Sequence, residues 1–246
     1  MKKRKEIPMA LLIILLVLGA LDLCWFLYER VKEKSTKAAM IKSSVSVLFM
    51  SVAAVAWSLV PAGAAHAKFA PFLLIGLLCG LLGDIWLDLK FVYPKENDIY
   101  TFAGFYAFAA GHILFILALI WQYGDASRWA YVVIPLLLGI VLGVGNLAME
   151  KPMKLNYGKF KGVTGFYGSI LIGVTLLCGS LALMNHFDVM TLNIMFVGLV
   201  FFLISDLILS GTYFGEGKDR PVDVITNHAA YYIAQFIIAT SIAFIA

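Results

Sequence analysis

Long apolar runs alternate with short polar connections along the whole chain. Each run extends for about 20 residues, the length that an α-helix needs to cross the hydrocarbon core of a bilayer. The connections carry charged residues, proline and glycine, which end helices. The pattern therefore predicts one domain over residues 1–246, an all-α polytopic membrane bundle of about eight transmembrane helices: 7–28, 40–60, 70–89, 98–122, 129–148, 162–184, 190–211 and 222–245.

The composition indicates the same class of protein. Hydrophobic residues make up 62% of the 246 positions and charged residues 14%, with a mean hydropathy of +0.91. A soluble domain has about 25% charged residues, so we expect an integral, multi-pass protein of the cell or cytoplasmic membrane. The net charge of +4 does not indicate a nucleic-acid partner, because the basic residues flank the apolar runs. The three cysteines are scattered without metal-ligand spacing and do not indicate a metal site.

The distribution of basic residues bears on orientation. Most of the 19 lysines and arginines follow the first, third, fifth and seventh runs. The positive-inside rule then favours the cytoplasmic side for these ends of the bundle. The cluster of basic residues over 2–5 argues for the opposite orientation.

The third apolar run carries the most informative polar residue. It continues without charge from Pro71 to Asp84, which places this carboxylate inside the membrane. A charge at that depth costs about 2.5 kcal/mol or more and marks a functional candidate. Gly76, Gly80, Asp84 and Asp88 recur every four residues and share one helical face. Glycines on this face let another helix approach closely, so we expect it to point into protein.

Similar stripes at four-residue intervals occur in three other runs. The separation along the chain between Asp84 and Asp206 is almost the same as the separation between His112 and Gln235. We infer that the third and fourth spans are repeated in parallel orientation as the seventh and eighth. The three stripes are Gly104, Phe108 and His112; Gly198, Phe202, Asp206 and Ser210; and Asn227, Tyr231 and Gln235.

The repeat predicts a shared polar site. Asp84 and Asp206 would lie at similar depth and approach each other, with His112, Tyr231 and Gln235 around them. Two carboxylates in a pocket of low dielectric constant tend not to ionise together, so one is expected to keep its proton. The pair would then supply an acid and a base. No HExxH metal motif or GxSxG nucleophile motif is present in the sequence.

These pieces resemble the YhhN-like lysoplasmalogenase family of eight-span membrane hydrolases, over most of the chain. Asp88 and the serines after Lys42 depart from the family pattern, which usually has an apolar residue and often proline there. Lys42 and Tyr167 fall where the family has such residues. The other matching pieces are Leu82-Gly83-Asp84 with Leu87, the stripe Gly104, Phe108 and His112, the segment Phe201–Asp206, and the segment Tyr231–Gln235.

The resemblance implies hydrolysis of the vinyl ether bond of a lysophospholipid, the lysoplasmalogen, at the bilayer and without a cofactor. Asp84 and Asp206 would be the catalytic acid and base, in an order that stays open. Lys42 would meet the phosphate. The expected substrate-binding residues are His112, Tyr231, Gln235, Lys42, Tyr167 and Asp88.

Two other functions stay open. A proton-coupled transporter of small solutes also has repeated spans with intramembrane carboxylates. An intramembrane aspartyl protease uses paired aspartates, but Leu81 stands where its GxGD motif needs glycine. The oligomeric state is not predicted.

Overall fold

The computed structural model describes residues 2–65, 67–217 and 220–245, and side chains from residue 7 onwards. The two ends of the predicted domain, residues 1 and 246, and the side chains of the basic cluster over 2–5 lie outside the described residues. Eight long helices account for most of the described chain, which confirms the all-α class. They are α1 (Lys2–Lys32), α2 (Thr36–Ser58), α3 (Phe69–Val92), α4 (Asn97–Tyr123), α5 (Ala130–Asn146), α6 (Lys161–Met184), α7 (Met190–Phe214) and α8 (Pro221–Ser241).

Local sequence signals set several helix ends. Ser35 precedes α2, and its hydroxyl accepts a hydrogen bond from the backbone N–H of Ala38 at 3.3 Å, which satisfies one of the free N–H groups of the first turn. Pro221 occupies the first turn of α8, where its missing N–H costs nothing. Pro94 follows the end of α3 and cannot continue it.

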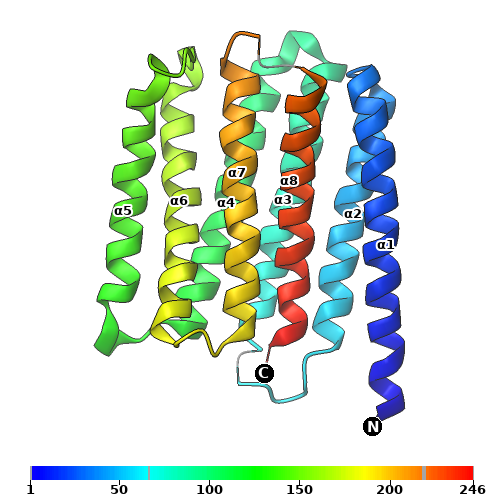
Figure 1. The fold of residues 1–246 in the computed structure, drawn as a ribbon, viewed down its shortest axis with the longest axis vertical. Helices are drawn as coiled ribbons and strands as arrows, with labels where there is room; N and C mark the ends of the chain where they lie inside the picture. Colours follow the sequence, from blue (N-terminus) through cyan, green and yellow to red (C-terminus); the bar gives the residue numbers. More distant parts are fainter. Residues whose placement is uncertain (1, 66, 218–219, 246) are drawn as a thin grey trace.

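The helices stand side by side along the longest axis of the molecule, with both chain ends at the same end of the bundle (Figure 1). Consecutive helices pack as four hairpins, α1–α2, α3–α4, α5–α6 and α7–α8. Helix α8 also packs against α1, α2 and α3, so the last helix of the chain returns to the first half. The predicted repeat of α3–α4 as α7–α8 stays a prediction.

Seven helices of the described chain are long and apolar enough to cross a membrane, and α8 is not among them. The prediction of about eight spans therefore agrees with the number of long helices. It differs in that one of these helices, α8, is less apolar than a membrane span. Helix α8 carries Asn227, His228 and Gln235 along its length. It can do so because α1, α2, α3 and α7 surround it, so its polar side chains meet protein groups rather than lipid.

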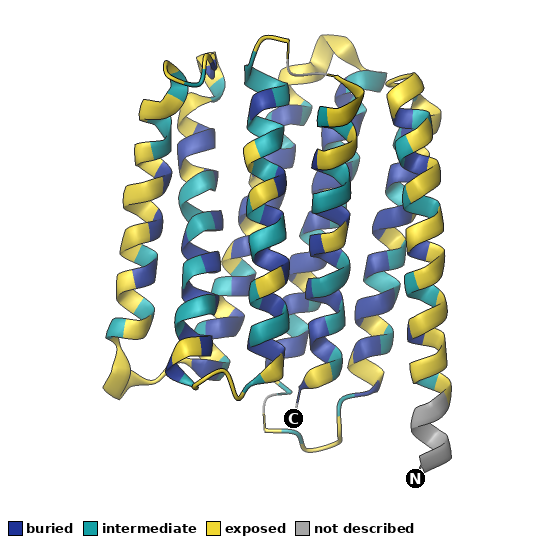
Figure 2. Cartoon of the chain, viewed as in Figure 1, coloured by how far each residue is buried: buried dark blue, intermediate teal, exposed yellow. Residues whose placement is uncertain are grey.

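Burial follows the pattern expected of a bundle in lipid. Buried residues face the centre, and exposed residues face outward and cover the two edge helices α1 and α5 (Figure 2). The outward side chains are largely apolar, for example Leu21 on α1 and Leu137 and Val141 on α5. A continuous exposed apolar surface of this kind fits lipid contact.

Glycines allow close contact between neighbouring helices. A Cβ atom on Gly111 of α4 would lie 2.7 Å from the carbonyl oxygen of Gly76 on α3. A Cβ atom on Gly139 of α5 would lie 2.4 Å from the Cα of Gly173 on α6. In both places the obstacle is backbone, so the helices could accept a side chain only by moving apart.

Gly139→Ala should therefore destabilise the protein by about 1–3 kcal/mol, the usual cost of overpacking. The matched control is Gly168→Ala in the middle of α6, where nothing lies within 4 Å of the added methyl group. Thermal unfolding in detergent measures both variants. An unchanged midpoint for Gly139→Ala would contradict the close α5–α6 packing.

Candidate active site

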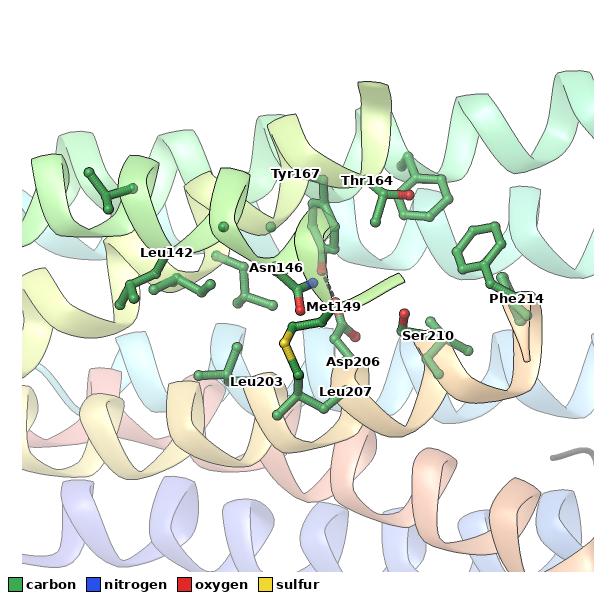
Figure 3. A pocket seen from close by; sticks show the side chains of 18 residues that line it. Leu142, Asn146, Met149, Thr164, Tyr167, Leu203, Asp206, Leu207, Ser210 and Phe214 are labelled. Atoms are coloured by element: carbon green, nitrogen blue, oxygen red, sulfur yellow. Dashed lines mark hydrogen bonds between the residues drawn. The ribbon is translucent and has the colours of Figure 1, made fainter. Parts of the chain in front are cut away.

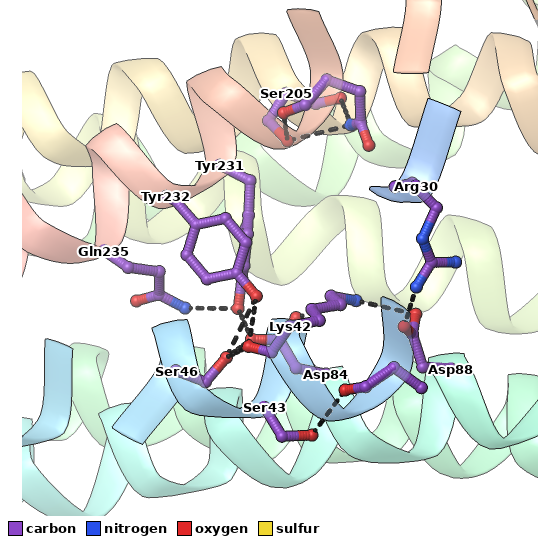
Figure 4. Close-up of polar contacts among 12 residues, drawn as sticks. Arg30, Lys42, Ser43, Ser46, Asp84, Asp88, Ser205, Tyr231, Tyr232 and Gln235 are labelled. Atoms are coloured by element: carbon purple, nitrogen blue, oxygen red, sulfur yellow. Dashed lines mark hydrogen bonds and ion pairs between the residues drawn. The ribbon is translucent and has the colours of Figure 1, made fainter. Parts of the chain in front are cut away.

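Asp84 lies at the centre of a buried polar network between α2, α3 and α8 (Figure 4). The Nζ of Lys42 lies 3.1 Å from its Oδ1. Ser46 and Tyr231 each donate a hydrogen bond of 2.7 Å to its Oδ2. The side chain of Asp84 is 2% exposed, so these three groups replace water as the partners of the carboxylate.

A second carboxylate extends the network towards the end of the bundle. Asp88 lies one turn after Asp84 on α3, and its Oδ1 is 3.2 Å from the Nζ of Lys42. Arg30, at the end of α1, forms an ion pair with the other oxygen of Asp88. Two cations and two carboxylates therefore alternate in the order Arg30, Asp88, Lys42, Asp84. Such pairing compensates charges that would otherwise be very costly to bury.

The hydroxyl groups around Asp84 are themselves held in place. Gln235 Nε2 donates to the hydroxyl of Tyr231 at 2.8 Å. The hydroxyl of Tyr232 donates to the backbone carbonyl of Lys42 at 3.0 Å and lies 3.1 Å from the Ser46 hydroxyl. Helix α8 thus positions the groups that contact Asp84.

Asp206 lies on α7 in a different environment. Its carboxylate accepts a hydrogen bond from the hydroxyl of Tyr167 on α6. Asp206 is half-buried, and within the described chain no lysine or arginine forms an ion pair with it. The two aspartates therefore differ: Asp84 is paired with a cation, and Asp206 with a phenol.

The two aspartates line the same small cavity, which we call the inner cavity. It has a volume of about 40 Å³, enough for a few water molecules. Lys42 and Tyr231 line it on the side of Asp84, and Tyr167 lines it beside Asp206. The cavity is too small to hold a lipid chain.

A larger pocket adjoins Asp206 on its other side. This outer pocket, of about 540 Å³, lies between α5, α6 and α7 and shares Asp206 and Tyr167 with the inner cavity (Figure 3). Its walls are mainly apolar, and exposed residues such as Val141 and Leu207 place it at the outer surface of the bundle. The other labelled lining residues include Leu142, Asn146, Met149, Leu203, Ser210 and Phe214.

Three predicted site residues line neither cavity. One is Asp88, whose ion pairs are described above, and the other two are His112 and Gln235. The Nδ1 of His112 lies 2.7 Å from the carbonyl oxygen of Phe108, and its ring packs edge-on against Phe202. Its buried Nε2 has no hydrogen-bond partner among the described residues. Gln235 lies behind Tyr231, as described above. A direct role for any of these three residues in substrate binding stays a prediction.

Sequence reasoning missed three members of the network. Ser46 follows Lys42 by one helical turn and Tyr232 is the neighbour of Tyr231, so both stood beside residues already singled out. Arg30 could not be singled out from the sequence, because an arginine at the end of an apolar run is ordinary.

For a metal ion, the described residues offer no group of three or more His, Cys, Asp or Glu side chains.

Removing the cation that Asp84 and Asp88 share, Lys42, should destabilise the folded protein. Lys42→Met leaves two buried carboxylates without their common partner, so we expect a loss of about 3–5 kcal/mol in the free energy of unfolding. Lys37→Met is the control, because the side chain of Lys37, which pairs with Glu29, is 60% exposed and its pair should matter much less. Equal stability of the two variants in chemical unfolding would contradict a structural role for the network.

Comparison with known proteins gives the family. The model of the YhhN family matches residues 37–242, which is most of the chain. No significant match was found among the curated proteins or among the solved structures. The chain therefore belongs to the YhhN family, a membership that is consistent with a membrane hydrolase.

Proposed function

We propose that the protein hydrolyses the vinyl ether bond of lysoplasmalogens. The products would be a fatty aldehyde and glycerophosphoethanolamine or glycerophosphocholine. One observation carries the proposal: carboxylates from α3 and α7 line a cavity of water size that shares Asp206 and Tyr167 with an apolar pocket at the lipid-facing surface. Membership of the YhhN family supports it.

The two cavities suit the two halves of the reaction. The outer pocket offers apolar walls for the hydrocarbon chain of the substrate and opens where lipid would surround the bundle. The inner cavity offers space for water beside Asp84. The vinyl ether would lie where the two meet, at Asp206 and Tyr167.

The different partners of the aspartates suggest their roles. Asp84 is stabilised as an anion by Lys42 and two hydroxyl donors. Asp206 has no such cation in the described structure, and an isolated charge in an apolar bundle is very costly, so it would hold a proton. We therefore assign Asp206 as the general acid and Asp84 as the ionised partner.

The reaction would proceed through a cation on the ether carbon. Asp206 donates its proton to the β-carbon of the vinyl ether, which leaves an oxocarbenium ion. The negative charge of Asp84 stabilises this ion, water attacks it, and Asp84 accepts the proton that the water releases. The resulting hemiacetal breaks its C–O bond to give the aldehyde and the alcohol of the glycerol headgroup. Water in the inner cavity then returns the proton from Asp84 to Asp206.

Replacing either carboxylate tests this assignment. Asp84→Asn and Asp206→Asn should each reduce aldehyde release from lysoplasmenylethanolamine by at least about a hundredfold, the scale of general acid–base catalysis. The control is Asp22→Asn, because Asp22 lies within α1, accepts a hydrogen bond from Ser44 and lines neither cavity. It should keep most of the activity.

A folded Asp206→Asn variant with near-normal turnover would exclude Asp206 as the acid. Absence of aldehyde from the wild-type protein, together with uptake of a labelled solute into vesicles, would favour the transporter instead. Cleavage of a peptide substrate that depends on both aspartates would favour the protease.

Protonation at carbon leaves an isotopic record. Hydrolysis in D₂O should place a single deuterium on the carbon next to the aldehyde group, because the carboxyl proton of Asp206 exchanges with solvent. Rapid trapping of the aldehyde and mass spectrometry measure it. Authentic aldehyde kept in the same mixture gives the uncatalysed exchange, and a trapped product with no deuterium above that level would contradict the mechanism.

A further inference from the structure

A third pocket lies at the end of the bundle where α3 and α7 end. This polar end pocket, of about 280 Å³, is lined by basic side chains from α1 and α3 and by residues at the starts of α4 and α8. It shares Asn227 and His228 with the inner cavity. The pocket therefore continues from the site of the two aspartates towards the headgroup region of the membrane.

Lys90 is an unusual cation in this pocket. Its side chain is buried, with the residue 8% exposed, and its Nζ lies 3.3 Å from the centre of the Tyr213 ring. Within the described residues it has neither a hydrogen bond nor an ion pair with a carboxylate. A buried lysine of this kind leaves its donors available for an anion that enters the pocket.

Arg30 adds a second donor that lacks a partner. Its Nη2 pairs with Asp88, but its Nε is buried and has no hydrogen-bond partner in the described structure. The guanidinium also lies 5.2 Å from the centre of the Phe91 ring, which lines the same pocket. Buried donors are normally satisfied, so an unpaired Nε on a residue that lines the same pocket as Lys90 points to a missing acceptor.

The carboxylates of the pocket already have partners. Asp88 is shared by Arg30 and Lys42, and Asp98 forms an ion pair with Lys159. Neither forms a direct ion pair with Lys90 within the described residues. The pocket keeps an excess of positive charge, which an incoming anion would compensate.

The three cavities are neighbours that share lining residues on α7. Leu209 and Tyr213 on α7 line the outer pocket, the inner cavity and the polar end pocket. Tyr213 lies two turns beyond Asp206, which is about 10 Å along the helix. This spacing leaves room for a glycerol backbone between an ether bond at Asp206 and a charged group beside Tyr213.

We propose that the polar end pocket binds the phosphate of the lysophospholipid, with Lys90 and Arg30 as its ligands. The inference rests on the proposed function and assigns the headgroup to a site different from the Lys42 expected from the sequence. Lys42 is shared by two carboxylates, so its charge is already compensated. The same chemistry would also accept a soluble phosphate ester.

Binding of a lipid that cannot be hydrolysed tests the site. The probe is an alkyl-ether lysophosphatidylethanolamine, which lacks the vinyl group, and the reference probe is an alkylglycerol with the same chain but no phosphate. Lys90→Gln should weaken binding of the phospholipid about tenfold, as expected for a lost charge-assisted hydrogen bond, and leave the alkylglycerol unchanged. Titration calorimetry in detergent measures both dissociation constants.

Two variants control for charge and for folding. Lys95→Gln removes the same charge at the same end of the bundle, from an exposed residue outside the pocket, and should bind both probes as the wild type does. Lys90→Arg keeps a cation and should retain phospholipid binding. Because neither probe reacts, the result stands whether or not the protein releases aldehyde.

Each outcome of these binding experiments either supports or overturns the phosphate site. A Lys90→Gln variant that binds both probes normally, or that loses both equally, would overturn the phosphate site. Competition by glycerol 3-phosphate identifies the source of the phosphate. Weak competition supports a lipid headgroup, and binding of glycerol 3-phosphate as tight as that of the lysophospholipid supports the same site with a soluble phosphate ester.

Discussion

The buried alternation of Arg30, Asp88, Lys42 and Asp84 is the constraint on which the polar interior of this bundle depends. Each charge would be very costly alone in an apolar bundle, and each becomes tolerable because its neighbour has the opposite sign. The network joins α1, α2 and α3. Tyr231 extends it to α8, which explains how the polar side chains on the inward face of this helix are accommodated.

The same network makes two similar residues chemically different. Asp84 and Asp206 both lie on helices that end at the same side, and both line the inner cavity. Of these two aspartates, Asp84 is paired with Lys42, whereas Asp206 accepts a hydrogen bond from the phenol of Tyr167. A mechanism that needs one neutral acid and one carboxylate could therefore arise from unequal partners. Direct sharing of a proton between the two side chains is not required.

The arrangement of the cavities suits an amphipathic substrate. An apolar pocket at the lipid-facing surface, a water-sized cavity with two aspartates, and a polar pocket with buried cations follow one another along α7. A single-chain phospholipid has its hydrocarbon, ether and phosphate in that order. This correspondence favours hydrolysis of such a lipid over transport of a small solute.

The sequence by itself determined the helical class and the long helices, because helical periodicity and hydropathy depend on neighbours along the chain. The depth of Asp84 and Asp206 in the membrane stays a prediction. The sequence also singled out Tyr231 and Gln235, which lie on a common stripe. It could not determine that Arg30 pairs with Asp88, 58 residues away, or that Tyr231 donates to Asp84, 147 residues away. Those contacts depend on the depth and rotation of each helix against the others, and only the packing of the whole bundle decides these.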